Sequence, residues 1–108
     1  MTERVQSAIA ARLDALSIPS RIATDSYPSI VALFEEAFAT YQNESACSSV
    51  GHTLTYADLD QLSAQFAGWL QHGAGLKRGD RVAVQMPNLI QYLVVCLGTL
   101  RAGMVVVN

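Results

Sequence analysis

The 108-residue sequence has few cysteines, little charge and no excess of basic residues. Seven Lys and Arg residues against nine Asp and Glu residues give a net charge of -2, which leaves no basic surface for nucleic-acid phosphates. The two cysteines, Cys47 and Cys96, show neither C-x-x-C spacing nor a secreted disulfide pattern. We therefore expect no nucleic-acid partner, and we interpret both cysteines as small core residues of a reduced, cytosolic protein.

Long apolar runs are also missing. The stretch 82–100 carries no charge, but Gln85, Pro87 and Asn88 interrupt it, and its unbroken apolar part, 92–97, is too short to cross a bilayer. Charged side chains within residues 1–16 exclude the apolar core of a secretory signal. The sequence therefore predicts neither a membrane span nor a secretory signal.

Apolar side chains, by contrast, are plentiful. They make up 51% of the residues, and charged side chains make up only 15%, which is typical of a piece cut from a larger protein. The last residues, 105–108, have the character of a buried strand and lack a polar terminus. We interpret the chain as a fragment, with a partly helical leader at residues 1–25 and an incomplete N-terminal portion of a larger domain at residues 26–108.

The most informative stretch is 76–108, because it predicts a strand, a helix and a second strand. Short apolar runs at 81–85 and 104–107 favour two parallel strands that are buried on both faces. A strand–helix–strand connection of this kind is right-handed in nearly all proteins. The sequence therefore predicts one right-handed parallel unit at the end of the chain.

The helix of this unit has signals at both ends. Asn88 and Gln91 form a capping-box pattern, so we expect the helix to begin at Asn88, directly after Pro87. Arg101 and then Gly103 supply the cation and the left-handed residue that are typical of a helix C-terminus. Apolar residues at helical spacing predict the packed face: Leu89, Tyr92, Leu93, Cys96, Leu97 and Leu100.

Two further helices are predicted in the first part of the chain. Residues 3–16 have apolar side chains at helical spacing, and Pro19 with Ser20 would end that helix. We favour a solvated or loosely docked extension, but its balanced charges leave open an apolar face that meets a membrane or a partner subunit. Residues 26–41 predict a helix with Pro28 in its first turn. Its apolar stripe is interpreted as core: Ile30, Leu33, Phe34, Ala37, Phe38 and Tyr41.

A hairpin and another helix fill the middle of the chain. Residues 46–50 would pair with residues 53–55 across a turn at Gly51 and His52. Thr55 and Asp58 form a capping box for a helix that ends near Gly73. Its predicted buried face consists of Leu59, Leu62, Phe66, Trp69 and Leu70.

No residue of the sequence has the neighbouring partner residues that a catalytic or metal-binding site requires. His52 and His72 each lack a nearby carboxylate or second histidine, so neither is assigned as a base or a metal ligand. Gly73 and Gly75 follow a helix and precede a strand, which is the reverse of a dinucleotide-binding loop. Helix termination explains both glycines better, and Lys77, Arg78 and Asp80 are interpreted as a solvated connection.

Several motifs resemble a known family. GDRVAVQMPN at residues 79–88, LRAGMVVVN at residues 100–108 and Leu54-Thr55-Tyr56 before a helix are similar to the N-terminal part of acyl-CoA synthetases in the adenylate-forming superfamily, above all bacterial long-chain fatty acid ligases. The likeness covers about residues 27–108. It implies an α/β fold that forms the N-terminal part of the large domain of such an enzyme.

The resemblance also implies a reaction. Members of the superfamily activate a carboxylic acid with ATP and magnesium, release pyrophosphate and pass the acyl group from AMP to coenzyme A. For this chain the resemblance implies a long-chain fatty acid substrate, a cytoplasmic protein in peripheral contact with the inner membrane, and a homodimer. The family's phosphate loop, ribose contact and mobile-domain lysine do not occur in these 108 residues. We therefore assign no catalytic, cofactor-binding or metal-binding residue, and we expect the chain alone to be inactive.

Two alternatives stay open. The first is another adenylate-forming enzyme, such as a medium-chain or aryl-acid ligase or a peptide-synthetase adenylation domain. The second is a small α/β interaction module without catalysis. The unpaired edges of a two-stranded parallel sheet argue against the second alternative.

Overall fold

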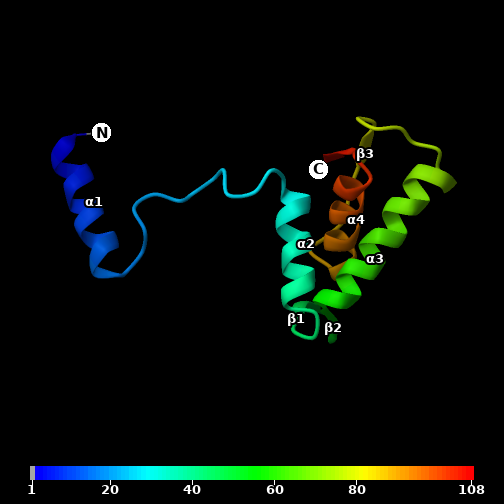
Figure 1. The fold of residues 1–108 in the computed structure, drawn as a ribbon, viewed down its shortest axis with the longest axis horizontal. Coiled ribbons are helices and arrows are strands. Elements are labelled where there is room, and N and C mark those ends of the chain that lie inside the picture. The colour runs from blue at the N-terminus through cyan, green and yellow to red at the C-terminus, as the bar shows by residue number, and fades with distance from the viewer. Residues whose placement is uncertain (1) are drawn as a thin grey trace.

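The computed structural model describes residues 2–108, and it separates a leader (residues 2–25) from a packed body (residues 26–108) (Figure 1). Helix α1 (Glu3–Ala15) stands apart from the body and buries none of its residues. The radius of gyration is 18.1 Å, whereas a compact chain of about 100 residues has roughly 13 Å. The predicted first helix is confirmed, and Ser17, in a left-handed conformation with φ 55°, ends it before Pro19.

Helix α2 (Ile30–Thr40) begins later than predicted. Ser29 is its N-cap, and the Ser29 hydroxyl accepts a hydrogen bond from the Ala32 N–H at 3.1 Å. The prediction that the helix starts at residue 26 with Pro28 in its first turn was wrong. A serine hydroxyl that satisfies a free N–H group of the first turn marks the start more strongly than the proline does.

Only part of the apolar stripe of α2 is core. Phe38 is buried, and Phe34 packs against the same cluster. Ile30, Leu33 and Tyr41 are exposed, so their assignment to the core was wrong. The physical reason is that α2 packs on α3 and α4 with one side only, and within residues 2–108 no helix or strand covers its other side.

Strands β1 (Ser45–Ser49) and β2 (His52–Thr55) form the predicted antiparallel hairpin. Its turn consists of Val50 and Gly51, with φ values of 50° and 77°. Two successive residues with positive φ are typical of a type I′ turn. His52 was predicted in the turn, and this was wrong, because His52 is already the first residue of β2.

Helix α3 (Tyr56–Gly68) begins as predicted. The Thr55 hydroxyl accepts a hydrogen bond from the Asp58 N–H at 3.1 Å, and the Asp58 carboxylate accepts one from the Thr55 N–H at 3.0 Å. The helix continues into a π-helical turn, η1 (Trp69–Gly73), so the predicted end near Gly73 is confirmed.

The buried face of α3 differs from the predicted one. Leu59 and Leu70 are buried as expected. Leu62 and Trp69 are exposed, so their prediction as buried residues was wrong. The ring of Trp69 stacks on Phe66 instead, with the ring centroids 5.8 Å apart.

Small residues explain this difference, because they bring α3 and α4 (Ile90–Arg101) close together. Ser63 and Ala67 of α3 are buried, and so is Gly98 of α4. A Cβ atom at Gly98 would lie 2.8 Å from the Ser63 carbonyl oxygen and 2.8 Å from Cδ1 of Phe66. The face of α3 that meets α4 is therefore chosen by small size as well as by hydrophobicity.

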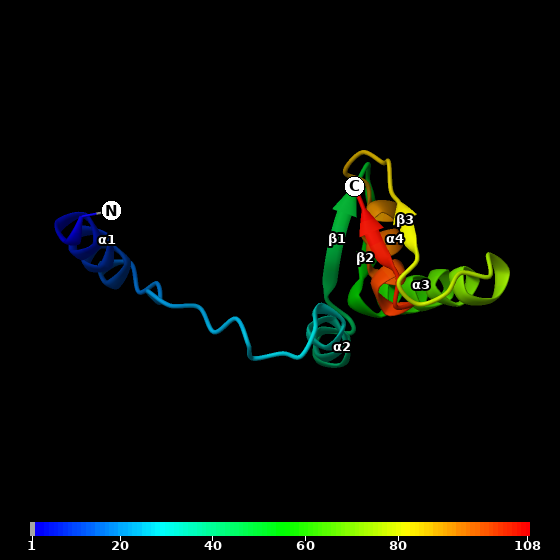
Figure 2. The ribbon, with the colours of Figure 1, turned by 90° about the horizontal axis from the view of Figure 1, so that it is seen from above.

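Strands β3 (Arg81–Ala83) and β4 (Val105–Val107) precede and follow α4 in the sequence and pair with each other in parallel, which confirms the strand–helix–strand unit. Both strands are shorter than predicted. Seen from above, the parallel pair lies in front of α4, and α2 and α3 lie toward the lower side of the view (Figure 2). Val105 and Val107 are exposed and Val106 is half-buried, so the prediction of burial on both faces was wrong. Among residues 2–108, helices cover only one face of these strands.

The two ends of α4 have different outcomes. The expected capping box at Asn88 does not form; the N-cap is Leu89, which makes no side-chain cap. The Ser49 hydroxyl of β1 accepts the hydrogen bond from the Ile90 N–H at 3.0 Å, so another element caps the helix. At the C-terminus, Gly103 has φ 83°, which confirms the predicted left-handed residue.

The core of the body consists of two clusters. One lies between α2, α3 and α4, and the other lies where α3 meets the end of α4 and the start of β4. The first contains Phe38, Leu59 and Leu97, and the second contains Ala67, Leu70, Ala102 and Met104.

Candidate functional site

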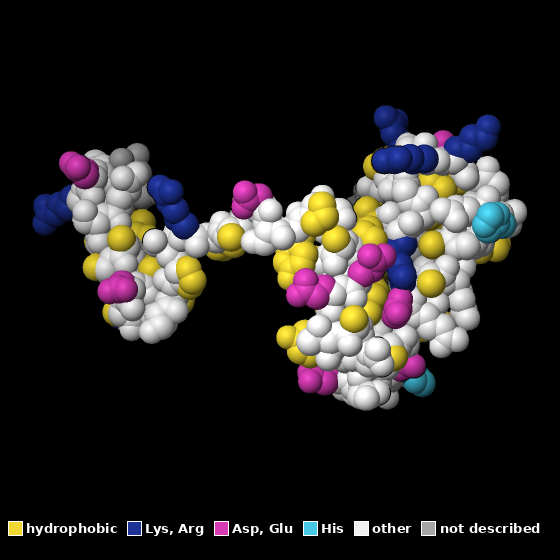
Figure 3. All heavy atoms as spheres, viewed as in Figure 1, with side chains coloured by type: hydrophobic (Ala, Val, Ile, Leu, Met, Phe, Trp, Pro, Cys, Tyr) yellow, Lys and Arg dark blue, Asp and Glu magenta, His cyan; other side chains and the backbone are white. Residues whose placement is uncertain are grey.

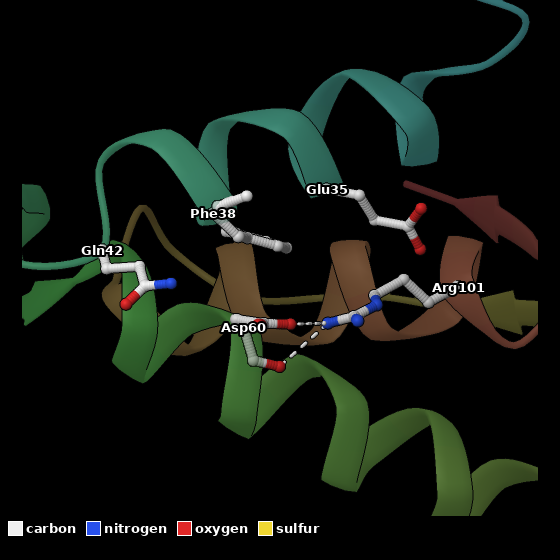
Figure 4. Close-up of a pocket in the computed structure, with 6 residues that line it drawn as sticks. Glu35, Phe38, Gln42, Asp60 and Arg101 are labelled. Carbon is white, nitrogen blue, oxygen red and sulfur yellow. Dashed lines mark hydrogen bonds and ion pairs between the residues drawn. The ribbon is translucent and has the colours of Figure 1, made fainter.

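A hollow of about 310 Å³ lies where α2, α3 and α4 meet (Figure 4). Asp60 comes from α3 and Arg101 from the end of α4, while Phe38 and Glu35 reach down from α2. The hollow is lined by Glu35, Phe38, Ala39, Gln42, Asp60 and Arg101.

Arg101 is the central side chain of this hollow. One of its terminal nitrogens, Nη1, donates to three oxygens: the Asp60 carbonyl at 2.8 Å, the Asp60 carboxylate at 2.8 Å and the Ser63 hydroxyl at 2.9 Å. The guanidinium carbon also lies 5.4 Å from the ring centre of Phe38, within the range of a cation–π contact. Arg101 thereby joins α4 to both α3 and α2.

The lining of the hollow offers little for catalysis. It contains no hydroxyl, thiol or imidazole that could act as a nucleophile or base. Asp60 is engaged by Arg101, and the two side chains are only partly exposed, 45% and 20%. We interpret the cluster as a joint between three helices. The sequence predicted Arg101 only as a helix C-terminal cation, and its partners on α2 and α3 could not be read from its local pattern.

A second, smaller hollow of about 190 Å³ lies between β1 and the start of α4. Cys47 and Tyr92 line it, beside Ser49. The Tyr92 hydroxyl donates a hydrogen bond to Asn108 Oδ1 at 2.6 Å. The neighbouring Cys96 thiol and partial desolvation raise the pKa of Tyr92, whereas the hydrogen bond with Asn108 lowers it.

The two cysteines are free and half-buried. They lie at the margin of the core and belong to neither buried cluster, so their interpretation as core residues was wrong. Cys47 lines the open hollow between β1 and the start of α4. His52 and His72 are both exposed, on β2 and η1.

The glycines after α3 end the helix, as predicted. Gly73 closes η1, and Gly75 has φ 67° in the turn that follows. The connection to β3 is exposed throughout, from Lys77 to Asp80. Asp80 stabilises this connection, because its carboxylate accepts a hydrogen bond from the Lys77 N–H at 2.7 Å.

Within the described part of the chain, no group of three or more His, Cys, Asp or Glu side chains could hold a metal ion. Among residues 2–108 no helix has the length and apolar character that crossing a bilayer requires. Arg101 is the one Lys or Arg side chain that lines either of the two hollows, and it is engaged by Asp60, so neither hollow offers a free cation to the phosphates of ATP or coenzyme A.

The fold and the sequence define a class of protein. Residues 34–108 match the family model for the AMP-binding enzymes. The chain belongs to this family of adenylate-forming enzymes, and its α/β arrangement corresponds to their N-terminal part.

Particular relatives narrow the class. The chain is 50% identical over 91 residues to a long-chain-fatty-acid–CoA ligase of Salmonella typhimurium, and 48% identical over 91 residues to one of Escherichia coli O157:H7. Each alignment covers 84% of this chain but only 16% of the ligase, so the chain spans about a sixth of its relatives. Among solved structures, the complex of VinN with 3-methylaspartate superposes with a TM-score of 0.69 and 34% identity, over 74% of this chain and 22% of VinN.

Proposed function

We propose that this chain is the N-terminal portion of the large domain of a ligase that joins a long-chain fatty acid to coenzyme A, with residues 1–25 as its leader. The reaction consumes ATP with magnesium and releases AMP and pyrophosphate through an acyl-adenylate. The observation that carries this proposal is the 50% identity to a long-chain-fatty-acid–CoA ligase across 84% of the chain.

The contribution of these residues is structural. The Arg101 joint and the close α3–α4 contact hold a rigid layer of helices against two pairs of strands. The groups that bind phosphates and stabilise their charge in the transition state belong to the rest of the ligase. The chain alone therefore binds neither ATP nor coenzyme A and is inactive.

Pyrophosphate release by the full-length protein tests the activity, with a panel of carboxylic acids and with or without coenzyme A. We expect activity on acids of about twelve or more carbons, where each added methylene strengthens binding by about 0.8 kcal/mol. Activity on none of the acids would contradict the proposal that the protein activates carboxylic acids with ATP. Isothermal calorimetry of the 108-residue chain with ATP tests the second point, and a saturable site would contradict it.

A second candidate is a ligase for another class of acid. The VinN structure favours it, because VinN is 34% identical to this chain and is bound to 3-methylaspartate, an amino acid. Activity on amino acids or aryl acids, without activity on long-chain acids, would establish this candidate in place of the first.

The proposal extends to location and assembly. A long-chain fatty acid dissolves in the bilayer, so we expect a cytoplasmic enzyme in peripheral contact with the inner membrane. A homodimer is supported by α1, whose apolar residues Val5 and Ile9 are exposed. Light scattering of the full-length protein with and without residues 1–25 tests the dimer; equal masses would show that the leader has no part in it.

A further inference from the structure

Charge is unevenly distributed over the body (Figure 3). The body has four cationic residues, and Arg101 is engaged in the ion pair with Asp60. The other three, Lys77, Arg78 and Arg81, lie within one stretch of five residues, 77–81, that leads from η1 into the start of β3. Figure 3 shows Lys and Arg side chains gathered at this end of the body, with most of the acidic side chains far from them. We call residues 77–81 the cationic turn.

The cationic turn is held in one shape. The Gly79 N–H donates to the Gly103 carbonyl at 2.9 Å, and the Val105 N–H donates to the Asp80 carbonyl at 2.8 Å, so the turn is fastened to the start of β4. Gly79 has φ 87°, which suits glycine. The turn thus presents its cations from a fixed backbone.

The three cations have no anionic partner within residues 2–108. All three are exposed, and the ion pair of Arg101 with Asp60 is the only one in the described part of the chain. Asp80 lies within the turn, but its carboxylate accepts the Lys77 backbone N–H. The turn therefore carries a net charge of +2, from three cations and one carboxylate, directed at solvent.

We propose that the cationic turn is the surface by which the protein contacts the anionic headgroups of a phospholipid membrane. This inference rests on the proposed function, because the substrate of a long-chain fatty acid ligase is dissolved in the bilayer. A small anion is a poorer fit, since no polar side chain of the turn is buried to hold one.

An acidic protein is also a poorer fit. Protein interfaces gain most of their affinity from a desolvated centre of aromatic and apolar anchors, and residues 77–81 contain none. Attraction to an anionic membrane needs only charges near its surface, at about 1 kcal/mol for each Lys or Arg. The turn therefore supplies a weak, reversible contact that salt weakens.

Vesicle sedimentation of the full-length protein tests the inference. The probes are vesicles of phosphatidylglycerol with phosphatidylcholine and vesicles of phosphatidylcholine alone. The test variant carries Lys77→Gln, Arg78→Gln and Arg81→Gln. The matched control carries Arg4→Gln, Arg12→Gln and Arg21→Gln, which removes the same charge from the leader.

We expect the wild type to prefer the anionic vesicles and to detach as salt increases. The test variant should bind them about ten- to a hundredfold more weakly, because three headgroup attractions are lost. The control should stay within about twofold of the wild type, because α1 stands apart from the turn. Because the stem of Arg78 lies over Gly103, a Lys77→Gln, Arg81→Gln double variant checks that the loss is not one of folding.

Equal binding of test variant and wild type would overturn the inference, and so would an equal loss in the leader control. Binding that is the same on both kinds of vesicle, or retention by an acidic protein surface without retention by anionic vesicles, would also overturn it. Pyrophosphate release with a fatty acid supplied in solution, without vesicles, is measured alongside. A test variant that is active but does not bind vesicles separates this inference from the proposed function, and a wild type that binds vesicles but activates no acid contradicts only the latter.

Discussion

Helices α1 and α4 are of nearly equal length, 13 and 12 residues, yet they stand in opposite relations to the rest of the protein. α1 buries no residue, whereas α4 buries Leu97, Gly98 and Thr99. Both helices have apolar residues at helical spacing, so spacing alone does not separate them. Most of the stability of a helix in a protein comes from packing of its apolar face, which α4 has and α1 lacks.

The polar residues of the two helices show the same contrast. Thr99 of α4 is fully buried, and its hydroxyl donates to the Val95 carbonyl at 2.7 Å. Arg101 donates to α3 through three hydrogen bonds. In α1, by contrast, even the N-cap Thr2 makes no side-chain hydrogen bond to the helix. The body therefore satisfies its buried polar groups internally, whereas the leader, residues 2–25, has no buried residue.

The largest expected effect separates the body from the leader directly. Leu59→Ala removes a side chain that is 1% exposed and should lower the free energy of unfolding by about 2–5 kcal/mol. Ile9→Ala, on the exposed face of α1, should change it by less than about 0.5 kcal/mol. Urea denaturation of the chain measures both. A similar loss in the two variants would show that α1 docks on the body in solution.

A pair of glycines sharpens the account of how the body packs. Gly98→Ala places a methyl group against the Ser63 carbonyl and should destabilise by about 1–3 kcal/mol. Gly68→Ala, in α3, meets nothing within 4 Å and should stabilise by up to about 1 kcal/mol, because alanine favours the helix. Thermal unfolding measures both. If both variants gain stability, α3 and α4 do not pack as closely at Gly98 as the structure shows.

The hairpin offers a smaller effect of opposite sign. Val50 is β-branched, has φ 50° and is 82% exposed, so it is strained in the turn and contributes little packing. Val50→Asn should raise the free energy of unfolding by about 1 kcal/mol, since asparagine tolerates the left-handed region. The midpoint of urea denaturation measures this gain. A loss of stability would mean that Val50 packs against a neighbour.

The smallest expected effect is a pH dependence at the junction of leader and body. The Tyr27 hydroxyl donates to Glu36 at 3.0 Å, and this hydrogen bond raises the pKa of Tyr27 above its ordinary value near 10. Because the folded pKa is the higher one, the stabilisation is complete below the unfolded pKa and is lost as pH rises through the folded value.

Denaturation of wild type and Tyr27→Phe between pH 8 and about 11 tests this sign. The wild type should lose its small advantage over the variant at the alkaline end. A difference between the two proteins that does not change with pH would show that the hydrogen bond is not formed.

Local signals in the sequence predicted much of the fold. The capping box of Thr55 with Asp58 and the left-handed Gly103 are confirmed, and so are the helix of residues 3–16, the hairpin and the parallel strands. Each of these depends on residues within a few positions of one another, where backbone geometry and hydrogen bonding act directly. Family membership was also readable, because it is carried by short motifs in a fixed order.

Only the tertiary structure decided which partners these elements take. The cap of α4 comes from Ser49 and the ion-pair partner of Arg101 is Asp60, each 41 positions away in the sequence. No local pattern contains such contacts, and the small Gly98, which packs against Ser63 and Phe66 of α3, is also distant from them in the sequence. Burial is a property of what lies opposite a side chain, which is why Leu62, Trp69 and Val105 are apolar and nevertheless exposed in this chain.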